Sequence, residues 1–217
     1  MPDQKRPYRK QRRAELEEAT RQRITESAVE LHGTLGPSRT SLSAIAAHAG
    51  VRRSTLYRHF ADEAALFAAC TADWMTSNPV PDLAGWTAIA DPDERLRVAL
   101  AELYPHYRCT EQMMTNILRD EQTMPIVAQL FAGFRQYIAA AHETLMTGRR
   151  ARGAARQRVL AATGHALAFT TWKSLATEQG LDDAQAADLM FRLVGASSTP
   201  PKSAANYPQA RTGRQRV

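Results

Sequence analysis

The sequence has little cysteine and no long apolar stretch. Cys70 and Cys109 are the 2 cysteines among 217 residues, too few for a disulfide framework or a cysteine-rich zinc module. Both fall within apolar helical patterns, so we expect them to be small core residues. No apolar run approaches the roughly 20 residues that cross a bilayer, and the start, Met1 to Arg6, lacks the apolar core of a signal peptide. We therefore expect a cytoplasmic protein without membrane contact.

The sequence also lacks the common catalytic and cofactor-binding motifs. It has no Walker loop, no glycine-rich dinucleotide fingerprint, no H-E-x-x-H pair and no nucleophile elbow. Asp120 and Glu121 are adjacent, but we expect a surface pair rather than an acid/base dyad. The histidines lack the spacing of metal ligands: His32, His48, His59, His106, His142 and His165. The sequence therefore predicts no enzyme activity, no metal site and no cofactor.

Basic residues gather at the start of the chain. The formal net charge is +6, from 28 Lys and Arg against 22 Asp and Glu. Residues 1–60 hold 12 basic and 6 acidic residues, whereas residues 61–217 hold 16 of each. A basic front on a body without net charge indicates a polyanion-binding module attached to another domain.

Apolar residues recur at helical spacing along the chain, and no strand pattern persists. We expect an all-α fold of about nine helices, with uninterrupted helices over 125–147 and 154–179 and a loose segment before a helix that starts at Asp91. The expected regions are a basic flexible arm over 1–20 that turns helical near Ala14, a three-helix domain over 21–66, a second helical domain over 67–196, and a disordered basic tail over 197–217.

The segment from Thr40 to Phe60, TSLSAIAAHAGVRRSTLYRHF, predicts two short helices joined by a turn at Gly50. Thr40-Ser41 offers a cap for the first helix, and Asp62 can cap the helix that follows. In the second helix Leu56 and Phe60 face the core, so its cationic and hydrogen-bonding side chains face away from it. This helix-turn-helix pattern favours DNA binding, with a solvated basic helix as the alternative.

The same residues resemble the N-terminal domain of the tetracycline-repressor (TetR) family of bacterial transcription regulators. The positions that match the family pattern are Thr40, Ser41, Leu42, Ile45, Ala46, Ala49, Gly50, Val51, Thr55, Leu56, Tyr57, His59 and Phe60. The resemblance covers residues 21–66 and implies that they form a helix-turn-helix DNA-binding domain, with an effector-binding and dimerisation domain over 67–196. It also implies a homodimer on a roughly palindromic operator in double-stranded DNA. The remainder of the chain resembles the family only in its length and helical content.

The resemblance also implies DNA contacts for individual residues. The major groove would receive Arg53, Ser54, Thr55 and Tyr57, with Arg53 the best placed for a bidentate contact to guanine. Phosphates would be held by Thr40, Ser41, Arg52, Tyr57, Arg58 and His59, with packing as the alternative for Tyr57 and a helix-end cap as the alternative for His59. Arg6, Arg9, Arg12 and Arg13 would enter the minor groove or screen phosphates. Glu63 departs from the family, where a basic residue is usual, and an acid there suits the helix dipole but repels phosphate.

Two sets of residues carry the predictions for the rest of the chain. A cavity for a small hydrophobic or neutral effector would be lined by Trp74, Trp86, Tyr104, Tyr107, Met113, Met114, Ile117, Phe131, Phe134, His165 and Trp172, although aromatic residues at helical spacing are also typical of a core. A dimer interface on the last two helices would use Leu160, Gly164, Leu167, Thr171, Leu175, Leu189, Met190, Leu193 and Val194, with burial inside one subunit as the alternative.

These features together predict a homodimeric repressor that a small-molecule effector releases from its operator. The alternatives are an effector-independent architectural DNA-binding protein and, with less support, a helical enzyme.

Overall fold

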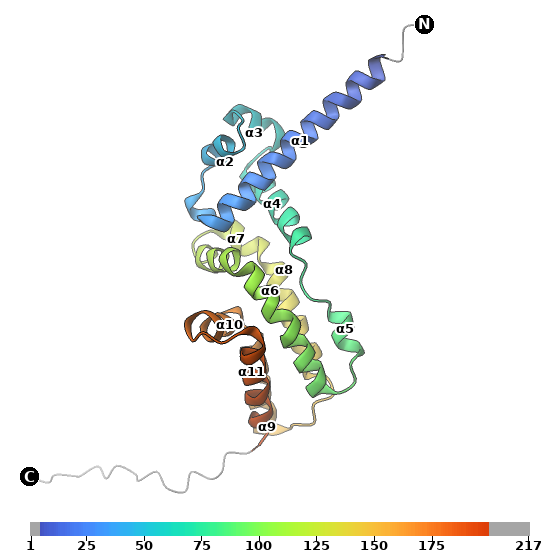
Figure 1. The fold of residues 1–217 in the computed structure, drawn as a ribbon, viewed down its shortest axis with the longest axis vertical. Coiled ribbons are helices and arrows are strands. Elements are labelled where there is room, and N and C mark those ends of the chain that lie inside the picture. Colours follow the sequence, from blue (N-terminus) through green and yellow to red (C-terminus); the bar gives the residue numbers. More distant parts are fainter. Residues whose placement is uncertain (1–4, 200–217) are drawn as a thin grey trace, which may run out of the picture.

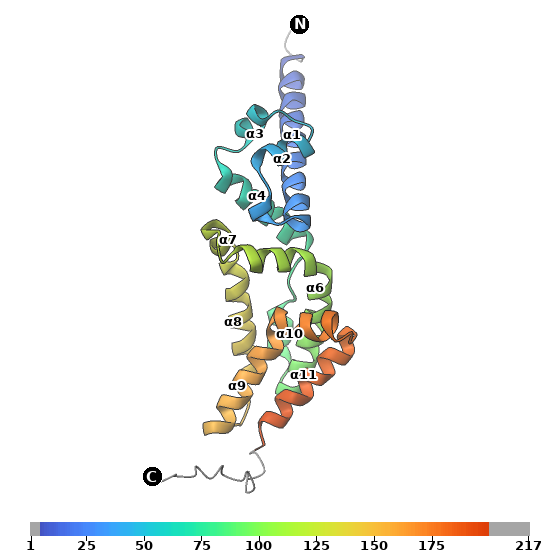
Figure 2. The same cartoon turned by 90° about the vertical axis from the view of Figure 1, so that its left-hand side faces the viewer.

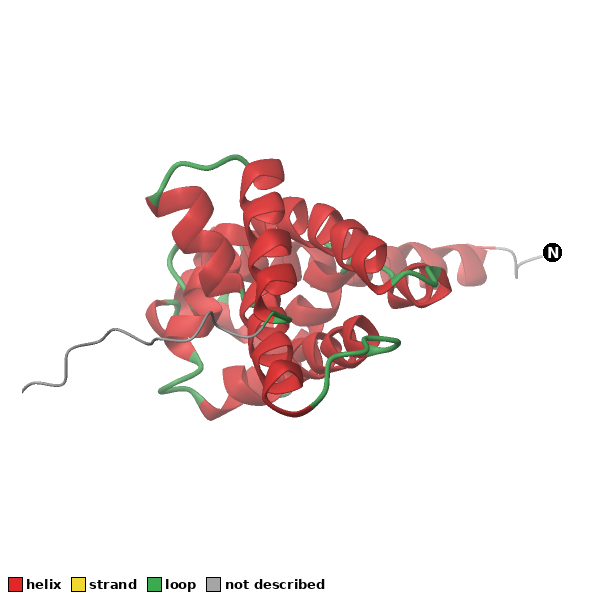
Figure 3. Cartoon of the chain, turned by 90° about the horizontal axis from the view of Figure 1, so that it is seen from below, coloured by secondary structure: helices red, strands yellow, loops and turns green. Residues whose placement is uncertain are grey.

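The computed structural model describes residues 5–199 of the chain, and within that range it contains helices and no strand, as Figure 3 shows. The all-α prediction is confirmed. The molecule is elongated, with a head made of α1 to α4 at one end and a body made of α5 to α11 at the other (Figure 1). Among residues 5–199, no helix combines the length and the apolar character needed to cross a membrane.

The head follows the predicted helix-turn-helix closely. Its elements are α1 (Lys5–Thr34), the 3-10 turn η1 (Pro37–Arg39), α2 (Leu42–His48), α3 (Arg53–His59) and α4 (Glu63–Ser77). Ser41 caps α2 by accepting a hydrogen bond from the backbone N–H of Ala44 at 3.1 Å, and Asp62 caps α4 by accepting one from Ala65 at 2.7 Å. Gly50, with φ of 66°, makes the turn between α2 and α3. These local signals position α3 on the outside of the head.

The expected flexible arm over 1–20 is replaced by helix from Lys5 onward. Pro7 is compatible with a helix there because the first four backbone N–H groups of any helix lack an intrahelical acceptor. Farther along, side-chain pairs one turn apart support the helix, with Arg13 Nε 3.0 Å from Glu17 Oε1. Figure 1 shows this first part of α1 extending beyond the head. Residues 1–4 lie outside the described part.

The body is built around one long helix, α6. Its elements are α5 (Leu83–Ala88), α6 (Pro92–Asp120), α7 (Pro125–Leu130), α8 (Ala132–Met146), α9 (Gly153–Leu167), α10 (Phe169–Lys173), the π-helical turn η2 (Ser174–Glu178) and α11 (Asp183–Ser197). Helix α5 lies where the sequence predicted a loose segment, and α6 continues through Pro105, whose ring is exposed. Figure 2 shows α7 lying directly beneath the head and α8 running down from it.

The helix predicted over 154–179 is broken at Ala168, which is extended with ψ of 130°. Such a break leaves the carbonyl groups of the preceding turn without their intrahelical donors, and two tyrosines of α6 donate hydrogen bonds to them. The Tyr104 hydroxyl donates to the Ala166 carbonyl at 3.0 Å, and the Tyr107 hydroxyl donates to the Leu167 carbonyl at 2.6 Å. The break is therefore stabilised by partners about 60 residues earlier in the chain. The helix predicted over 125–147 is likewise divided, at Phe131.

The predicted disordered tail lies almost entirely outside the described residues, since only 197–199 of it are included. One core prediction is wrong: Cys70 is buried as expected, but Cys109 is exposed on α6.

Candidate functional sites

Helix α3 exposes most of the side chains that the sequence assigned to DNA. Leu56 and Phe60 are each 1% exposed and anchor the helix in the core of the head. The outward side chains are Arg52, Arg53, Ser54, Tyr57 and Arg58, with Thr55 half-buried beside them. An Arg53 guanidinium N–H donates to the Tyr57 hydroxyl at 3.1 Å, and the guanidinium carbon lies 5.5 Å from the centre of the tyrosine ring. A cation and a hydroxyl thus stand together on the outer face of the helix.

Of the remaining predicted DNA-binding residues, Thr40 and Ser41 form hydrogen bonds inside the head, whereas His59 packs at the end of α3. The Thr40 hydroxyl donates to the Gly36 carbonyl at 2.8 Å, so its hydrogen is already used, whereas the Ser41 oxygen acts as a cap and keeps its hydrogen free. His59 is half-buried, and its Nε2 is buried without a hydrogen-bond partner. Burial and the neighbouring Arg58 lower the pKa of His59 below its ordinary value. This geometry suits packing at the end of α3 better than a phosphate contact.

An arginine that the sequence did not single out holds the end of α3. Arg21 of α1 donates from Nη1 to the His59 carbonyl at 2.7 Å, and its guanidinium lies 4.2 Å from the centre of the Phe60 ring. Elsewhere on the head, Arg12 and Arg13 of α1 are exposed, and Glu63 lies exposed in the first turn of α4. The side chains of Arg6 and Arg9 lie outside the described part.

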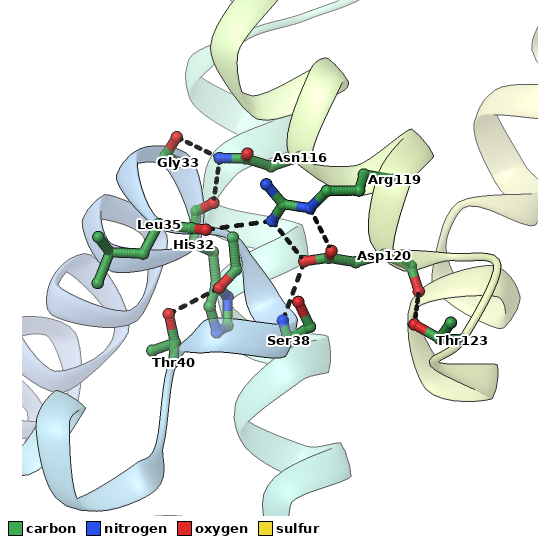
Figure 4. Close-up of polar contacts among 10 residues, drawn as sticks. His32, Gly33, Leu35, Ser38, Thr40, Asn116, Arg119, Asp120 and Thr123 are labelled. Carbon is green, nitrogen blue, oxygen red and sulfur yellow. Dashed lines mark hydrogen bonds and ion pairs between the residues drawn. The ribbon is translucent and has the colours of Figure 1, made fainter.

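Head and body are joined by polar side chains at the end of α6, drawn in Figure 4. Asn116 donates from Nδ2 to the carbonyl groups of His32 at 3.1 Å and Gly33 at 2.7 Å. Arg119 donates from Nη2 to the Leu35 carbonyl at 3.1 Å. These carbonyls belong to the C-terminal end of α1, where a helix lacks its own donors. The body therefore completes the hydrogen bonding of the head, and we call this cluster the head–body joint.

Asp120 is the acidic member of the head–body joint. Its carboxylate accepts hydrogen bonds from the Ser38 backbone N–H at 2.9 Å and from Arg119 Nε at 2.7 Å. Burial alone raises the pKa of Asp120, but the bonds from Arg119 and Ser38 outweigh it and hold the pKa below its ordinary value. The prediction that Asp120 and Glu121 form a surface pair is wrong, because Asp120 is only 2% exposed and binds the head.

A cavity of about 300 Å³ lies between head and body. It is lined by Val29, His32, Pro37, Phe67, Cys70, Thr71, Trp74, Met75, Asn78, Pro79, Val80, Met113, Met114, Ile117, Val127, Leu130, Phe131, Gly133, Phe134 and Tyr137. Six of these were predicted from the sequence: Trp74, Met113, Met114, Ile117, Phe131 and Phe134. Apart from Trp74, the residues from α1 and α4 were not predicted, because their second apolar face becomes a cavity wall only when the body packs against it.

The other five residues of the predicted cavity lie elsewhere. Trp86, Tyr104, Tyr107 and Trp172 are buried in the core of the body, each at 1% exposure or less, and His165 is exposed on α9. Both indole N–H groups already have partners, since Trp86 donates to Glu102 at 2.7 Å and Trp172 donates to Asp183 at 2.9 Å. These side chains are therefore structural in this conformation.

Two buried polar side chains meet in the cavity wall. Cys70 Sγ lies 3.6 Å from His32 Nδ1, and the His32 ring stacks on Phe67 with 4.8 Å between ring centres. Burial lowers the pKa of His32 to about 4, although Asp120 acts in the opposite direction, and burial raises the pKa of the Cys70 thiol to about 12. Both groups are consequently uncharged near neutral pH.

Three leucines are exposed on α9 and α11, two helices that pack against each other. Leu160 is 41% exposed, Leu189 is 38% exposed and Leu193 is 48% exposed. Among the other predicted interface residues, Leu167, Thr171, Met190 and Val194 are buried within the chain itself, and Gly164 and Leu175 are half-buried. The four buried residues are therefore covered by their own subunit, and α11 packs against both α6 and α9.

Comparison with known proteins assigns the head to a family. Residues 24–70 match the family model described as "Bacterial regulatory proteins, tetR family". No curated protein matches the sequence. The match covers the helix-turn-helix and most of α4, the segment that presents the exposed face of α3.

Solved structures of similar fold extend over most of the chain. A TetR-like transcriptional regulator from Rhodococcus sp. RHA1 has 21% sequence identity and a TM-score of 0.59, covering 82% of this chain and 94% of that one. A second Rhodococcus transcriptional regulator has 18% identity and a TM-score of 0.56, covering 83% and 99%. The HlyIIR mutant protein has 17% identity and a TM-score of 0.56, covering 86% and 100%. At these identities the likeness shows the fold, and the family model assigns residues 24–70, which include the helix-turn-helix, to the tetR family of bacterial regulatory proteins.

Proposed function

We propose that the protein is a homodimeric repressor in the cytoplasm, and that a small hydrophobic or neutral effector releases it from a palindromic operator. The observation that carries the proposal is the cavity between head and body. Because α1 and α4 of the head and α6 to α8 of the body all line it, a molecule bound there contacts both parts at once. A ligand that favours one arrangement of the two parts shifts the protein toward that arrangement.

The proposed DNA contacts centre on α3. Arg53 and Tyr57 read base edges together with Ser54 and Thr55, because they share the outer face of the helix. Arg52, Arg58 and Ser41 hold phosphates and fix the register of the head on the duplex. Arg12 and Arg13 add positive charge along the exposed start of α1.

The proposed dimer forms through α9 and α11. The exposed side chains of Leu160, Leu189 and Leu193 are the kind of apolar surface that subunit interfaces cover. Pairing α9 and α11 with their counterparts across a two-fold axis gives a four-helix bundle. Such a dimer presents two α3 helices to half-sites about one DNA turn (~34–36 Å) apart, or a multiple of that spacing.

The head–body joint supplies the proposed route from effector to DNA. Asn116, Arg119 and Asp120 lie on the same stretch of α6 as Met113, Met114 and Ile117 of the cavity wall. A shift of α6 that accommodates a ligand therefore also moves the groups that bind the end of α1 and the turn before α2. The α3 helices of a dimer would then no longer match the two half-sites.

Selection of genomic DNA fragments by the purified full chain tests the proposal. We expect a palindrome to be enriched, light scattering to give the mass of a dimer, and the Arg53→Ala variant to lose about 1–3 kcal/mol of binding at one base position. A screen of small molecules on the protein–operator complex then tests release. If a palindrome is enriched but no compound releases the protein from it, the result favours the effector-independent DNA-binding protein instead. If no sequence is enriched, the result contradicts both the repressor and the effector-independent protein.

A further inference from the structure

The lining of the cavity restricts the molecules that can bind in it. None of its described lining residues is Asp, Glu, Lys or Arg. An ionised ligand would therefore lose its hydration without gaining a counter-charge, which is costly in an apolar site. The cavity suits a neutral molecule, and its polar side chains decide which hydrogen bonds that molecule can make.

His32 is the most deeply buried polar ring in the cavity wall, at 4% exposure. Its Nδ1 faces Cys70, and among the described residues none hydrogen-bonds to its other nitrogen, Nε2. Among the described side chains, the buried nitrogen and oxygen atoms without a hydrogen-bond partner are His59 Nε2 and Thr163 Oγ1. His32 lines the cavity, and Nε2, which has no partner and is not fully enclosed, is the ring nitrogen left for a ligand there.

The hydrogen bonds of Cys70 determine which nitrogen of His32 carries the proton. The Cys70 thiol donates its single hydrogen to the Phe67 carbonyl at 3.2 Å. It has no second hydrogen for His32, so we assign the hydrogen of the 3.6 Å contact to Nδ1, with the sulfur as its acceptor. A neutral imidazole with its hydrogen on Nδ1 has a bare lone pair on Nε2. His32 thus offers the cavity an acceptor and no donor.

We infer that the cavity binds a neutral, largely apolar molecule that carries a hydroxyl group, such as an alkylphenol or a long-chain alcohol, and that this hydroxyl donates a hydrogen bond to His32 Nε2. Two other polar side chains of the lining keep an acceptor: the Tyr137 hydroxyl has used its single hydrogen, and Asn78 has used one of its two N–H groups but keeps its side-chain oxygen. The Tyr137 hydroxyl donates to the Pro81 carbonyl at 2.9 Å, and Asn78 Nδ2 donates to the Trp74 carbonyl at 3.0 Å. A ligand donor therefore finds acceptors on more than one wall.

Three compounds with one carbon skeleton test this inference by calorimetry on the full-length protein without DNA. 4-Hexylphenol is neutral and donates a hydrogen bond, 4-hexylanisole is neutral and cannot donate, and 4-hexylbenzoate is an anion near neutral pH. We expect the phenol to bind about fivefold or more tightly than the anisole, because a net hydrogen bond contributes about 1 kcal/mol. We expect the benzoate to bind more weakly than either. Equal binding of phenol and anisole, tighter binding of the benzoate, or no binding of the phenol overturns the inference.

His32→Phe is the variant that removes the proposed acceptor. Phenylalanine keeps a ring against Phe67, and Cys70 keeps its bond to the Phe67 carbonyl. We expect the phenol to lose its advantage over the anisole, whose own affinity stays the same. His142→Phe is the matched control, because His142 bonds to the Leu160 carbonyl at 2.9 Å, away from the cavity, and should leave the advantage intact. An undiminished phenol preference in His32→Phe overturns the inference.

A second measurement needs no variant of His32. Nitrogen-15 NMR of the wild-type protein distinguishes the two neutral forms of a histidine, and we expect His32 to carry its hydrogen on Nδ1. A hydrogen on Nε2 in the ligand-free protein overturns the inference, because that nitrogen would then be a donor. This result stands even if His32→Phe does not fold.

The inference rests on the proposed function only in taking the bound molecule to be the effector. The inferred ligand class and the proposed effector release can be contradicted separately. Selective binding of the phenol without release of operator DNA leaves the ligand class standing and contradicts effector release. Release of operator by a compound that lacks a hydroxyl, with no phenol preference in calorimetry, contradicts the ligand class and leaves effector release standing.

Discussion

Replacing Asp120 with alanine should weaken the whole protein, because this carboxylate bonds the body to the turn that precedes the helix-turn-helix. The variant leaves the Ser38 N–H without its acceptor at 2.9 Å. It also removes the negative charge to which Nε and Nη2 of Arg119 donate hydrogen bonds. A hydrogen bond to an ionised group contributes about 1.5–3 kcal/mol. The Arg119 guanidinium is open to solvent, so its ion pair adds nothing to this figure. We expect Asp120→Ala to lower the free energy of unfolding by about 2–3 kcal/mol.

Urea denaturation followed by circular dichroism measures this loss in the full chain. Glu17→Ala is the matched control, because Glu17 also pairs with an arginine but is 51% exposed on α1. Exposed pairs of this kind contribute about 0.3–0.5 kcal/mol. Asp120→Asn, which keeps an acceptor, should fall between the two variants. If Asp120→Ala costs no more than Glu17→Ala, the head–body joint does not stabilise the fold and the proposed route from cavity to DNA loses its physical basis.

Three further predictions concern the joint, the dimer and the cavity. Gly36→Ala should destabilise the protein by about 1–3 kcal/mol, since φ is +96° and a Cβ would overlap Arg119; Gly180→Ala, with φ of +74° but open space around it, should cost less in the same urea titration. Leu193→Glu should halve the mass seen by light scattering, whereas Leu16→Glu on α1 should not, and a dimer that survives Leu193→Glu would refute the α9–α11 interface. His32 stays neutral in the folded protein down to a pKa of about 4 but takes up a proton in the unfolded chain near its ordinary 6.5, so its contribution is complete above pH 6.5 and is lost as the pH falls toward 4. Over that range wild type should lose about 3 kcal/mol more stability than His32→Phe, and parallel pH profiles would show that His32 is not buried as described.

The helix-turn-helix was predictable because its signals are local. The Ser41 cap, the positive φ at Gly50 and the Asp62 cap each act within a few residues of their own position in the chain. The alternation of Leu56 and Phe60 with exposed cations likewise needs only the period of a helix to place one face inward. The exposed side of α3 could therefore be read from 21 consecutive residues, from Thr40 to Phe60.

The cavity was only partly predictable, because much of its wall comes from the head. Met113, Met114 and Ile117 were expected from the body, but His32, Phe67 and Cys70 read equally well as core of the head. Local patterns show that a residue avoids water. They do not show whether the neighbouring volume is filled. Tyr104 and Tyr107 illustrate the opposite error, since their hydroxyls support the broken end of α9 instead of facing a ligand.

The sequence by itself determined an all-α chain with a basic DNA-binding head, because caps, helical periodicity and charge are properties of neighbouring residues. The tertiary structure decided where head meets body. It buried Asp120 against Ser38, 82 positions earlier in the chain, and opened the cavity beside that contact. Contacts between residues so distant in sequence depend on how helices pack, and no local pattern encodes that packing.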